Sequence, residues 1–252
     1  MGRPLVIAHR GYSDRAPGNT LAAFRLGWEC GADGVECDVQ LTKDGKVVCI
    51  HDLDTNWVAN EKIKVADASW QELRSLDVGS WKDSAWEQER IPLLKEAIGE
   101  GPANLRWVIE IKCGDEIVKP LMEVLEGLGQ TIWERIIVIS FKEKPLIELK
   151  RRRPSAKAYW LSELSESVSG SYSPSVERII SNVERLGVDG FGGQSGQGIS
   201  QELCQALVER GLELNVWTVD DEREALRMAE IGVTSITTND PKRILNTLLE
   251  NS

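Results

Sequence analysis

Histidine is scarce in this chain of 252 residues, which has only His9 and His51, and cysteine occurs at five scattered positions. An odd number of scattered cysteines is typical of reduced thiols in the cytoplasm and argues against a disulfide framework or a zinc site. No apolar run approaches the length of a membrane span, and the N-terminal residues lack the apolar core of a signal peptide. We therefore expect a cytoplasmic protein without an integral membrane segment.

Positive charge is also in short supply. The chain has 30 lysines and arginines against 40 aspartates and glutamates, so its formal net charge is −10 and its pI is about 4.9. This balance argues against nucleic acid or an anionic membrane as the main partner, and an anionic small molecule would need a local cluster of basic groups. The length and the 41% hydrophobic content fit a globular protein with one large α/β barrel or two smaller domains.

Asp44-Gly45 separates two runs that are rich in β-branched residues, 35–41 and 46–50. An Asp-Gly pair between such runs is the strongest hairpin signal that a short stretch of sequence offers. The pattern predicts two antiparallel strands joined by a two-residue loop, in which Lys43 pairs with Lys46.

In that register Asp38 lies directly opposite His51, and Glu36 shares the same face because side chains alternate along a strand. Two carboxylates and an imidazole would then meet at one place. The alternative is an edge hairpin whose acidic face is exposed to solvent. Val35 and Val39, which flank the acids, favour a buried strand instead.

Apolar segments of strand type alternate with amphipathic segments of helix type along most of the chain. We expect strands at 5–8, 35–41, 107–111, 136–140, 157–161, 188–191, 214–218 and 235–237, and helices at 21–30, 69–76, 93–98, 117–128, 146–152, 174–186, 202–210, 221–231 and 241–249. This rhythm predicts a single (β/α)8 TIM barrel over residues 1–252, with 52–92 as a small insertion after the hairpin that covers the site. An open doubly wound sheet is the alternative, but no glycine-rich phosphate loop follows the first strand.

Ionisable side chains gather near the ends of the first three predicted barrel strands. They are His9 and Arg10 after the first strand, Glu36 and Asp38 on the second, Glu110 and Lys112 on the third, and His51, which the hairpin returns to the same rim. Barrel enzymes place their chemistry at the C-terminal ends of their strands. We therefore expect the functional site at this rim.

The three carboxylates Glu36, Asp38 and Glu110 converge without a histidine or cysteine ligand. Hard oxygen donors of this kind suit Mg²⁺ or Ca²⁺ better than Zn²⁺, and without a cation they would raise one another's pKa values. The alternative is a salt-bridge network in which Arg10 and Lys112 neutralise the acids. Two bases cannot cover three acids while also binding an anion, so the sequence favours a divalent cation.

Arg10 and Lys112, together with such a cation, would recognise a phosphate group, Arg10 through its planar fork and Lys112 as a point charge. His9 and His51 could act as base and acid, because imidazole titrates near neutral pH. Either histidine alone would more often be structural. A pair that flanks a metal site predicts phosphodiester cleavage.

A set of motifs along nearly the whole chain resembles the glycerophosphodiester phosphodiesterase family. The motifs are His9-Arg10-Gly11, Pro17-x-Asn19-Thr20, Glu36-x-Asp38, Gln40-Leu-Thr-Lys-Asp-Gly45, His51-Asp52, Glu110-x-Lys112, Ile139-Ser140-Phe141 and Val216-Trp217-Thr218-Val219. The resemblance implies a barrel enzyme of glycerol and lipid metabolism. It would use a divalent cation to hydrolyse sn-glycerol 3-phosphate esters of small alcohols.

The same resemblance implies a role for each matching residue. Metal ligands would be Glu36, Asp38 and Glu110, the acid–base pair would be His9 and His51, the phosphate would be held by Arg10 and Lys112, and Trp217 would line the substrate pocket. For Trp217, packing as a barrel aromatic is nearly as good an interpretation.

Three positions depart from the family pattern. Gly18 replaces the usual glutamate before Asn-Thr, and its small size is expected to leave space beside the bound phosphate. Leu53 is followed by 54–57 instead of x-Arg-Thr-Thr, which puts the alcohol specificity in doubt. The family's Thr-Asp becomes Thr238-Asn239. None of these changes removes an expected ligand or histidine.

Two other functions remain open. A lysophospholipase D-like enzyme on the same barrel should expose an apolar lid, which Trp57, Trp81 and Trp86 could form, although burial in the core of the insertion is the preferred interpretation. A non-catalytic phosphate-binding module is suggested by Gly18 but disfavoured by the two intact histidines. The sequence leaves the oligomeric state open.

Overall fold

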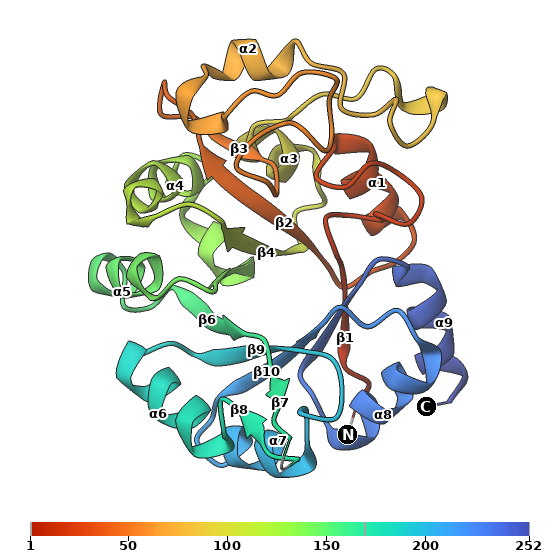
Figure 1. Cartoon of the computed structure of the whole chain (residues 1–252), viewed down its shortest axis with the longest axis vertical. Coiled ribbons are helices and arrows are strands. Elements are labelled where there is room, and N and C mark those ends of the chain that lie inside the picture. Colours follow the sequence, from red (N-terminus) through yellow and green to blue (C-terminus); the bar gives the residue numbers. More distant parts are fainter. Residues whose placement is uncertain (1, 169, 252) are drawn as a thin grey trace.

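The computed structural model describes residues 2–168 and 170–251, which form a closed barrel of parallel strands surrounded by helices (Figure 1). The eight parallel strands are β1 (Leu5–Ala8), β2 (Gly34–Leu41), β4 (Arg106–Ile111), β5 (Ile136–Ser140), β6 (Lys157–Ser162), β9 (Gly190–Gln194), β10 (Glu213–Trp217) and β11 (Ser235–Thr238). Pairing of β1 with both β11 and β2 closes the ring. The predicted (β/α)8 barrel is confirmed.

Helices follow the barrel strands and cover their outer face (Figure 1). They are α1 (Leu21–Glu29), α3 (Leu94–Glu100), α4 (Val118–Glu126), α5 (Glu143–Arg152), α6 (Val176–Leu186), α7 (Gln201–Val208), α8 (Glu222–Ile231) and α9 (Pro241–Glu250). Several begin at a serine, threonine or aspartate whose side chain accepts a hydrogen bond from a backbone amide of the first turn. Among the helices of the described residues, none is long and apolar enough to cross a bilayer.

The strands have apolar residues on both faces because each strand contacts two hydrophobic cores. Val108 and Ile139 point into the barrel, where they join a compact interior cluster with Tyr159. Trp107 points outward into the larger core beneath the helices, and its ring meets Phe24 edge to face at 5.4 Å. Such double burial explains the continuous apolar runs of the sequence.

The strand β2 is longer than the barrel needs and continues beyond the rim as a hairpin with β3 (Val47–Cys49) (Figure 1). The observed register pairs Val39 with Cys49 and Leu41 with Val47. The amide of Thr42 donates to the carbonyl of Lys46 at 3.0 Å, so the loop has three residues, 43–45. The predicted two-residue loop, with Lys43 paired to Lys46, is therefore wrong.

This slip by one residue changes the partner of Asp38. Its backbone carbonyl accepts from the amide of Ile50 at 3.0 Å, so Ile50 and not His51 lies opposite. A shift of one residue turns every side chain of a strand to the other face. His51 still reaches the site because it follows the end of β3, where the ladder no longer dictates its direction.

The 52–92 segment lies over the hairpin and beside α1 (Figure 1). It contains α2 (Trp70–Arg74) and two short 3-10 turns, η1 (Val65–Asp67) and η2 (Ser84–Trp86). Its own small core joins the hairpin through Val48, Ile50, Val65, Leu73, Leu76, Val78 and Ile91. Trp57 and Trp81 lie outside this core, with exposed fractions of 77% and 54%, so their expected burial is wrong.

One further pair of strands has no counterpart in the sequence-based prediction. β7 (Ser165–Glu166) and β8 (Tyr172–Ser173) form a short antiparallel hairpin between β6 and α6. Both strands have two residues, and β7 is fully exposed, so no apolar alternation marks them in the sequence.

Replacing Gly45 by alanine should destabilise the hairpin that carries the acids. Gly45 has a φ of +73°, a conformation that costs an L-residue about 1–2 kcal/mol, and no atom lies within 4 Å of the position of an added Cβ. The free energy of unfolding in urea should fall by about that amount.

Gly99→Ala is the matched control, because Gly99 lies in α3 and also faces open space. It should raise the same free energy by about 0.5–1 kcal/mol. Equal effects at the two positions would contradict this account.

Candidate active site

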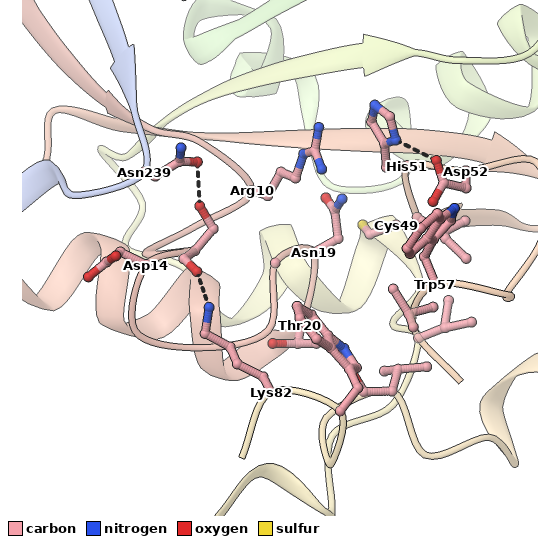
Figure 2. Close-up of a pocket in the computed structure, with 17 residues that line it drawn as sticks. Arg10, Asp14, Asn19, Thr20, Cys49, His51, Asp52, Trp57, Lys82 and Asn239 are labelled. Atoms are coloured by element: carbon pink, nitrogen blue, oxygen red, sulfur yellow. Dashed lines mark hydrogen bonds and ion pairs between the residues drawn. The ribbon is translucent and has the colours of Figure 1, made fainter. Parts of the chain in front are cut away.

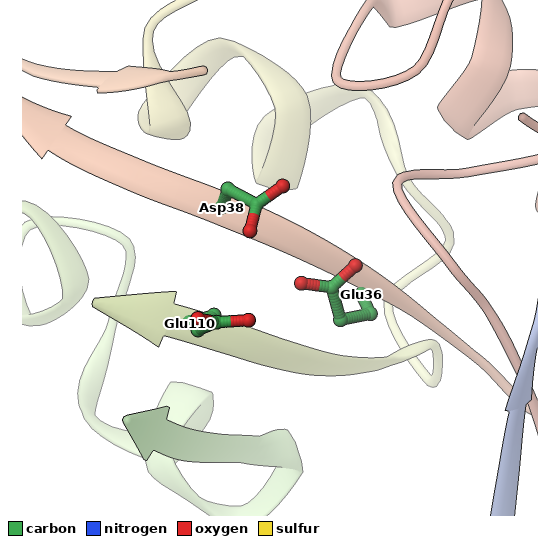
Figure 3. Close-up of side chains that lie close together, drawn as sticks. All are labelled: Glu36, Asp38 and Glu110. Carbon is green, nitrogen blue, oxygen red and sulfur yellow. The ribbon is translucent and has the colours of Figure 1, made fainter. Parts of the chain in front are cut away.

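Three buried carboxylates face one another inside the upper part of the barrel (Figure 3). Glu36 and Asp38 are two residues apart on β2 and share a face, and Asp38 is in register with Glu110 on β4. One carboxylate oxygen from each residue lies within 4.8 Å of those of the other two. Glu36 and Asp38 were expected at the end of their strand, but β2 extends past the rim and leaves them within it.

Asp38 is the most heavily bonded of the three acids, and its side chain is fully buried. Its Oδ2 lies 3.0 Å from Nε of Arg10, and Lys112 Nζ lies 3.7 Å from its Oδ1. The Asn19 side chain donates to Asp38 Oδ2 at 2.8 Å and accepts from its backbone amide at 3.0 Å. Asn19 therefore fixes Asp38 from both sides.

The other two acids are less well neutralised. Glu110 Oε1 accepts from Lys112 Nζ at 2.7 Å. Glu36 Oε2 accepts from the backbone amide of Arg10 at 2.8 Å, and among the described residues no lysine or arginine nitrogen lies within 4.0 Å of this carboxylate. Within the same part of the chain, Glu36 Oε1 and Asp38 Oδ1 are buried without a hydrogen-bond donor. Two buried carboxylate oxygens that accept no hydrogen bond, in a cluster of three acids, fit a cation.

The pKa values of the acids reflect this imbalance of charge. Burial, and then repulsion by Asp38 and Glu110, raises the pKa of Glu36 well above its usual value. Burial and the charge of Asp38 raise the pKa of Glu110 to about 7. Burial alone would also raise the pKa of Asp38, but Arg10, His51 and Lys112 lower it below the usual value. The cluster holds more negative charge than its own bases neutralise.

The loop between β1 and α1 adopts two backbone conformations that are uncommon away from glycine. Arg10 has a φ of 55° and Asn19 a φ of 63°, and they are the two non-glycine residues with positive φ in the described chain. The conformation at Arg10 aims its amide at Glu36, and Asn19 contacts Asp38. Backbone strain of this kind concentrates at functional sites.

His9 is held by a chain of hydrogen bonds that leads away from the acids. Its Nδ1 lies 2.7 Å from Oδ1 of Asn239, whose Nδ2 donates to Asp220 at 2.6 Å. Because Asp220 fixes the orientation of the amide, the Asn239 oxygen faces His9 and accepts its Nδ1–H. Nε2 is then the unprotonated nitrogen. Burial, and then the charge of Arg10, lowers the pKa of His9 to about 4.

His51 is held by a carboxylate instead of an amide. Its Nδ1 lies 2.8 Å from Oδ1 of Asp52, and the Gln40 side chain donates to the backbone carbonyls of both residues, to that of His51 at 3.1 Å. The first turn after β3 is thereby tied to β2.

A cavity of about 270 Å³ opens above the acids at the mouth of the barrel. Seven of the predicted site residues line it, namely His9, Arg10, Glu36, His51, Glu110, Lys112 and Trp217, and Asp38 lies in direct contact with this group. Its far wall is less polar, because the Trp217 ring meets Phe141 edge to face at 5.3 Å. The structure brings all eight predicted residues together.

The model of the glycerophosphoryl diester phosphodiesterase family matches residues 9–243, which include every residue of this site. The chain belongs to that family. The expected resemblance and enzyme class are confirmed.

Relatives and solved structures agree with this membership. The chain is 34% identical over 247 residues to a glycerophosphodiester phosphodiesterase of Caldanaerobacter subterraneus subsp. tengcongensis, covering 97% of each chain. It is 30% identical to one of Bacillus altitudinis, covering 94% of this chain and 95% of that protein. A phosphodiesterase of Oleispira antarctica, solved with the product sn-glycerol-3-phosphate, superimposes with a TM-score of 0.86 at 27% identity, covering 98% and 97%.

In this family member, several residues of the site had no role in the sequence-based prediction. Asn19, which was named only as part of the Pro17-x-Asn19-Thr20 motif, binds Asp38 with its side chain, while its neighbour Thr20 caps α1. Asp220 and Asn239 come from loops far from His9 in sequence. Asn19 and Asn239 both lie in family motifs, and these motifs could have indicated that the two residues belong to the site. No sequence motif indicated a role for Asp220.

Gly18 lies beside the Arg10 side chain and lines a cavity. A Cβ atom at Gly18 would lie 3.1 Å from Cβ and 3.3 Å from Cδ of Arg10. A larger residue at this position would therefore require the Arg10 side chain to shift by a few tenths of an ångström. That Gly18 leaves space beside a bound phosphate stays a prediction.

Without a cation in the acid cluster, the stability of this protein should depend on pH through Glu110. Its folded-state pKa of about 7 exceeds the ordinary glutamate pKa of 4.5, so between these values the folded chain keeps a proton that the unfolded chain has lost. The free energy of unfolding therefore falls as the pH rises through this window. Urea unfolding in chelator at about pH 5 and about pH 8 should show a smaller fall for Glu110→Gln than for wild type.

The control for that experiment is Glu177→Gln on α6. Glu177 is exposed, and a hydrogen bond from its own backbone lowers its pKa, so the sign of its contribution is opposite. This variant should leave the fall with pH intact. If Glu110→Gln and Glu177→Gln behave alike, Glu110 does not carry the effect.

Asn239→Leu should release the His9 ring and lower kcat by roughly tenfold, the effect of about one hydrogen bond. KM should change little, because Asn239 lies behind the ring. Since the chain has only two histidines, ¹⁵N NMR of the imidazoles can report the loss of the Nδ1–H form of His9 directly. Ser13→Ala is the control, because it removes only the 2.8 Å bond from the Ser13 hydroxyl to the same oxygen. A wild-type spectrum and kcat in Asn239→Leu would refute the positioning role.

Proposed function

We propose that the chain is a metal-dependent phosphodiesterase that hydrolyses glycerophosphodiesters to sn-glycerol 3-phosphate and an alcohol. The observation that carries the proposal is the cluster of three buried acids, of which two oxygens accept no hydrogen bond, beside two histidines and two bases. Support also comes from the Oleispira antarctica structure, because that similar barrel was solved with sn-glycerol-3-phosphate.

In this proposal Glu36, Asp38 and Glu110 hold one divalent cation, Mg²⁺ or Ca²⁺. Their all-oxygen donor set suits a hard ion, and the bound charge would offset the repulsion that raises the pKa values of Glu36 and Glu110. The cation would polarise the phosphoryl oxygens and neutralise their charge.

Arg10 and Lys112 would bind the remaining phosphate oxygens, because both line the cavity beside the acids. The two histidines would divide the proton transfers. His9 Nε2 would take a proton from the attacking water as its oxygen bonds to phosphorus. His51, which is held in place by the contact of its Nδ1 with Asp52, would give a proton to the alcohol oxygen as the P–O bond breaks.

The glycerol arm would occupy the cavity of about 270 Å³ inside the barrel mouth. Trp217 and Phe141 would contact its carbon backbone. Polar groups of Asn215 and Thr237 lie in the same wall and could bind its hydroxyls.

We further propose that residues 1–252 act as one barrel domain in which the 52–92 segment covers the site. Its own core joins the hairpin that carries His51, which supports a cover instead of an independent unit. The reaction would belong to glycerol and lipid metabolism. The five free cysteines suit the reducing cytoplasm.

One observation favours a second candidate, the lysophospholipase D-like activity. Trp57 and Trp81 are exposed on the 52–92 segment and line a second cavity that contains His51. An apolar lid of this kind suits an amphiphilic substrate. Release of lysophosphatidic acid from lysophosphatidylcholine would distinguish this activity from the main proposal.

Hydrolysis of glycerophosphocholine and glycerophosphoethanolamine, followed by release of sn-glycerol 3-phosphate, tests the proposed function. Chelation should abolish turnover, and Mg²⁺ or Ca²⁺ should restore it. His9→Ala and His51→Ala should each lower kcat by roughly 10²–10⁴-fold, the range for a positioned acid or base. Each variant should also lose one limb of the pH–rate profile.

Other results would refute individual parts of this proposal. Full activity in excess chelator, with no metal by elemental analysis, would refute the metal site. Wild-type kcat in either histidine variant would make that histidine structural. Binding of sn-glycerol 3-phosphate without turnover of any diester would favour a phosphate-binding module.

A further inference from the structure

A second cavity, of about 480 Å³, is lined by residues that include Arg10, Asn19, His51 and Trp57 (Figure 2). It shares Arg10 and His51 with the first cavity. Those two residues therefore separate two spaces, and a phosphate held between them can extend one ester arm into each. If glycerol fills the barrel cavity, the alcohol arm enters the second one.

The walls of this second cavity have unlike chemistry. One wall is the loop between β1 and α1, which contributes Ser13, Gly18 and Asn19. The other wall comes from the end of the hairpin and the 52–92 segment, and is formed by Cys49, Ile50, Trp57, Val58, Val78, Trp81 and Ile91. The 52–92 segment thus gives the cavity an apolar side.

Two tryptophans at this apolar side are exposed instead of buried. Trp57 is 77% and Trp81 54% exposed, whereas the neighbouring Val78 and Ile91 are buried in the small core of the segment. Trp81 is fixed in place, because its Nε1 donates to the carbonyl of Val78 at 2.9 Å. Large exposed aromatic side chains beside a cavity mark a binding surface.

The charged groups that line the cavity are already paired within the protein. Arg10 contacts Asp38, and Asp52 contacts His51. Lys82 donates to the carbonyl of Ser13 at 2.6 Å, and Asp14 lies 3.5 Å from Arg15. Each charged side chain of the described lining therefore already has a partner within the protein.

The position of Lys82 favours an uncharged ligand over a cationic one in this cavity. Its ammonium group lies 5.7 Å from the centre of the Trp81 ring, where the cation of choline would bind in an aromatic cage. A second cation there would be repelled by the first. An uncharged arm meets no such repulsion and gains from contact with the apolar wall.

We propose that this cavity binds the alcohol arm of the substrate and selects an apolar arm, an alkyl or acyl chain, over choline or ethanolamine. The inference rests on the proposed function, because it assumes a phosphodiester held between Arg10 and His51. Trp57 and Trp81 are the residues that determine the selection.

The test measures binding, so that it does not depend on turnover. The probes are non-hydrolysable phosphonate analogues with a constant glycerol arm and a methyl, butyl or octyl second arm, titrated calorimetrically into the Mg²⁺-loaded protein. Affinity should rise by up to about fourfold for each methylene that becomes buried. Trp57→Ala and Trp81→Ala should flatten this dependence on chain length. The Kd for sn-glycerol 3-phosphate should not change in either variant, because that molecule lies in the other cavity.

Leu249→Ala is the matched control, because Leu249 is 56% exposed on α9 and does not line the cavity. It should keep the wild-type dependence on chain length. A second pair of probes isolates charge: the choline arm and its neutral isostere, the 3,3-dimethylbutyl arm. The neutral arm should bind more tightly.

Three results would overturn the proposal: butyl binding no tighter than methyl, an unchanged chain-length dependence in both tryptophan variants, or tighter binding of the choline arm. Failure of the proposed function gives a different pattern. If no diester is hydrolysed but affinity still rises with chain length, the proposed function is refuted and the proposed role of the cavity stands. If diesters are hydrolysed but affinity does not depend on chain length, the role of the cavity is refuted and the proposed function stands.

Discussion

The burial of three carboxylates beside two bases is the interaction on which the rest of the site depends. Glu36, Asp38 and Glu110 lie within one small volume, where Arg10 contacts Asp38 and Lys112 lies between Glu110 and Asp38. The excess negative charge is held by the barrel itself, because β2 and β4 are locked in register from Gly34 to Val39. Such an arrangement is costly in a folded protein unless a ligand uses it.

Loops from distant parts of the chain hold the rest of the site around this charge. The β1–α1 loop brings Arg10 and Asn19 to Asp38, both in uncommon backbone conformations. Asn239 holds His9, and Asp52 holds His51. The different partners give two chemically identical rings different environments. An amide oxygen lies beside Nδ1 of His9, whereas a carboxylate oxygen lies beside Nδ1 of His51.

Much of the fold could be predicted because long periodic segments report burial directly. The strand at 136–140 was predicted with its observed bounds, and α8 and α9 within one residue at each end. The predicted hairpin register was wrong because Asp-Gly suits a two-residue loop and also the last two positions of a three-residue loop. The prediction that Trp57 and Trp81 are buried was wrong for another reason. The general tendency of tryptophan to be buried does not show whether a given tryptophan lines an open cavity.

The sequence by itself determined the barrel, the acids and the two histidines, because strand periodicity and family motifs are local properties of the chain. Tertiary structure alone decided that Asp220 supports His9 through Asn239, and that Lys82 bridges the 52–92 segment to Ser13. These contacts join residues that are far apart in sequence, and barrel closure determines which loops meet. Which oxygens stay unpaired in the acid cluster was likewise decided only by the folded geometry, since pairing depends on distances of a few tenths of an ångström.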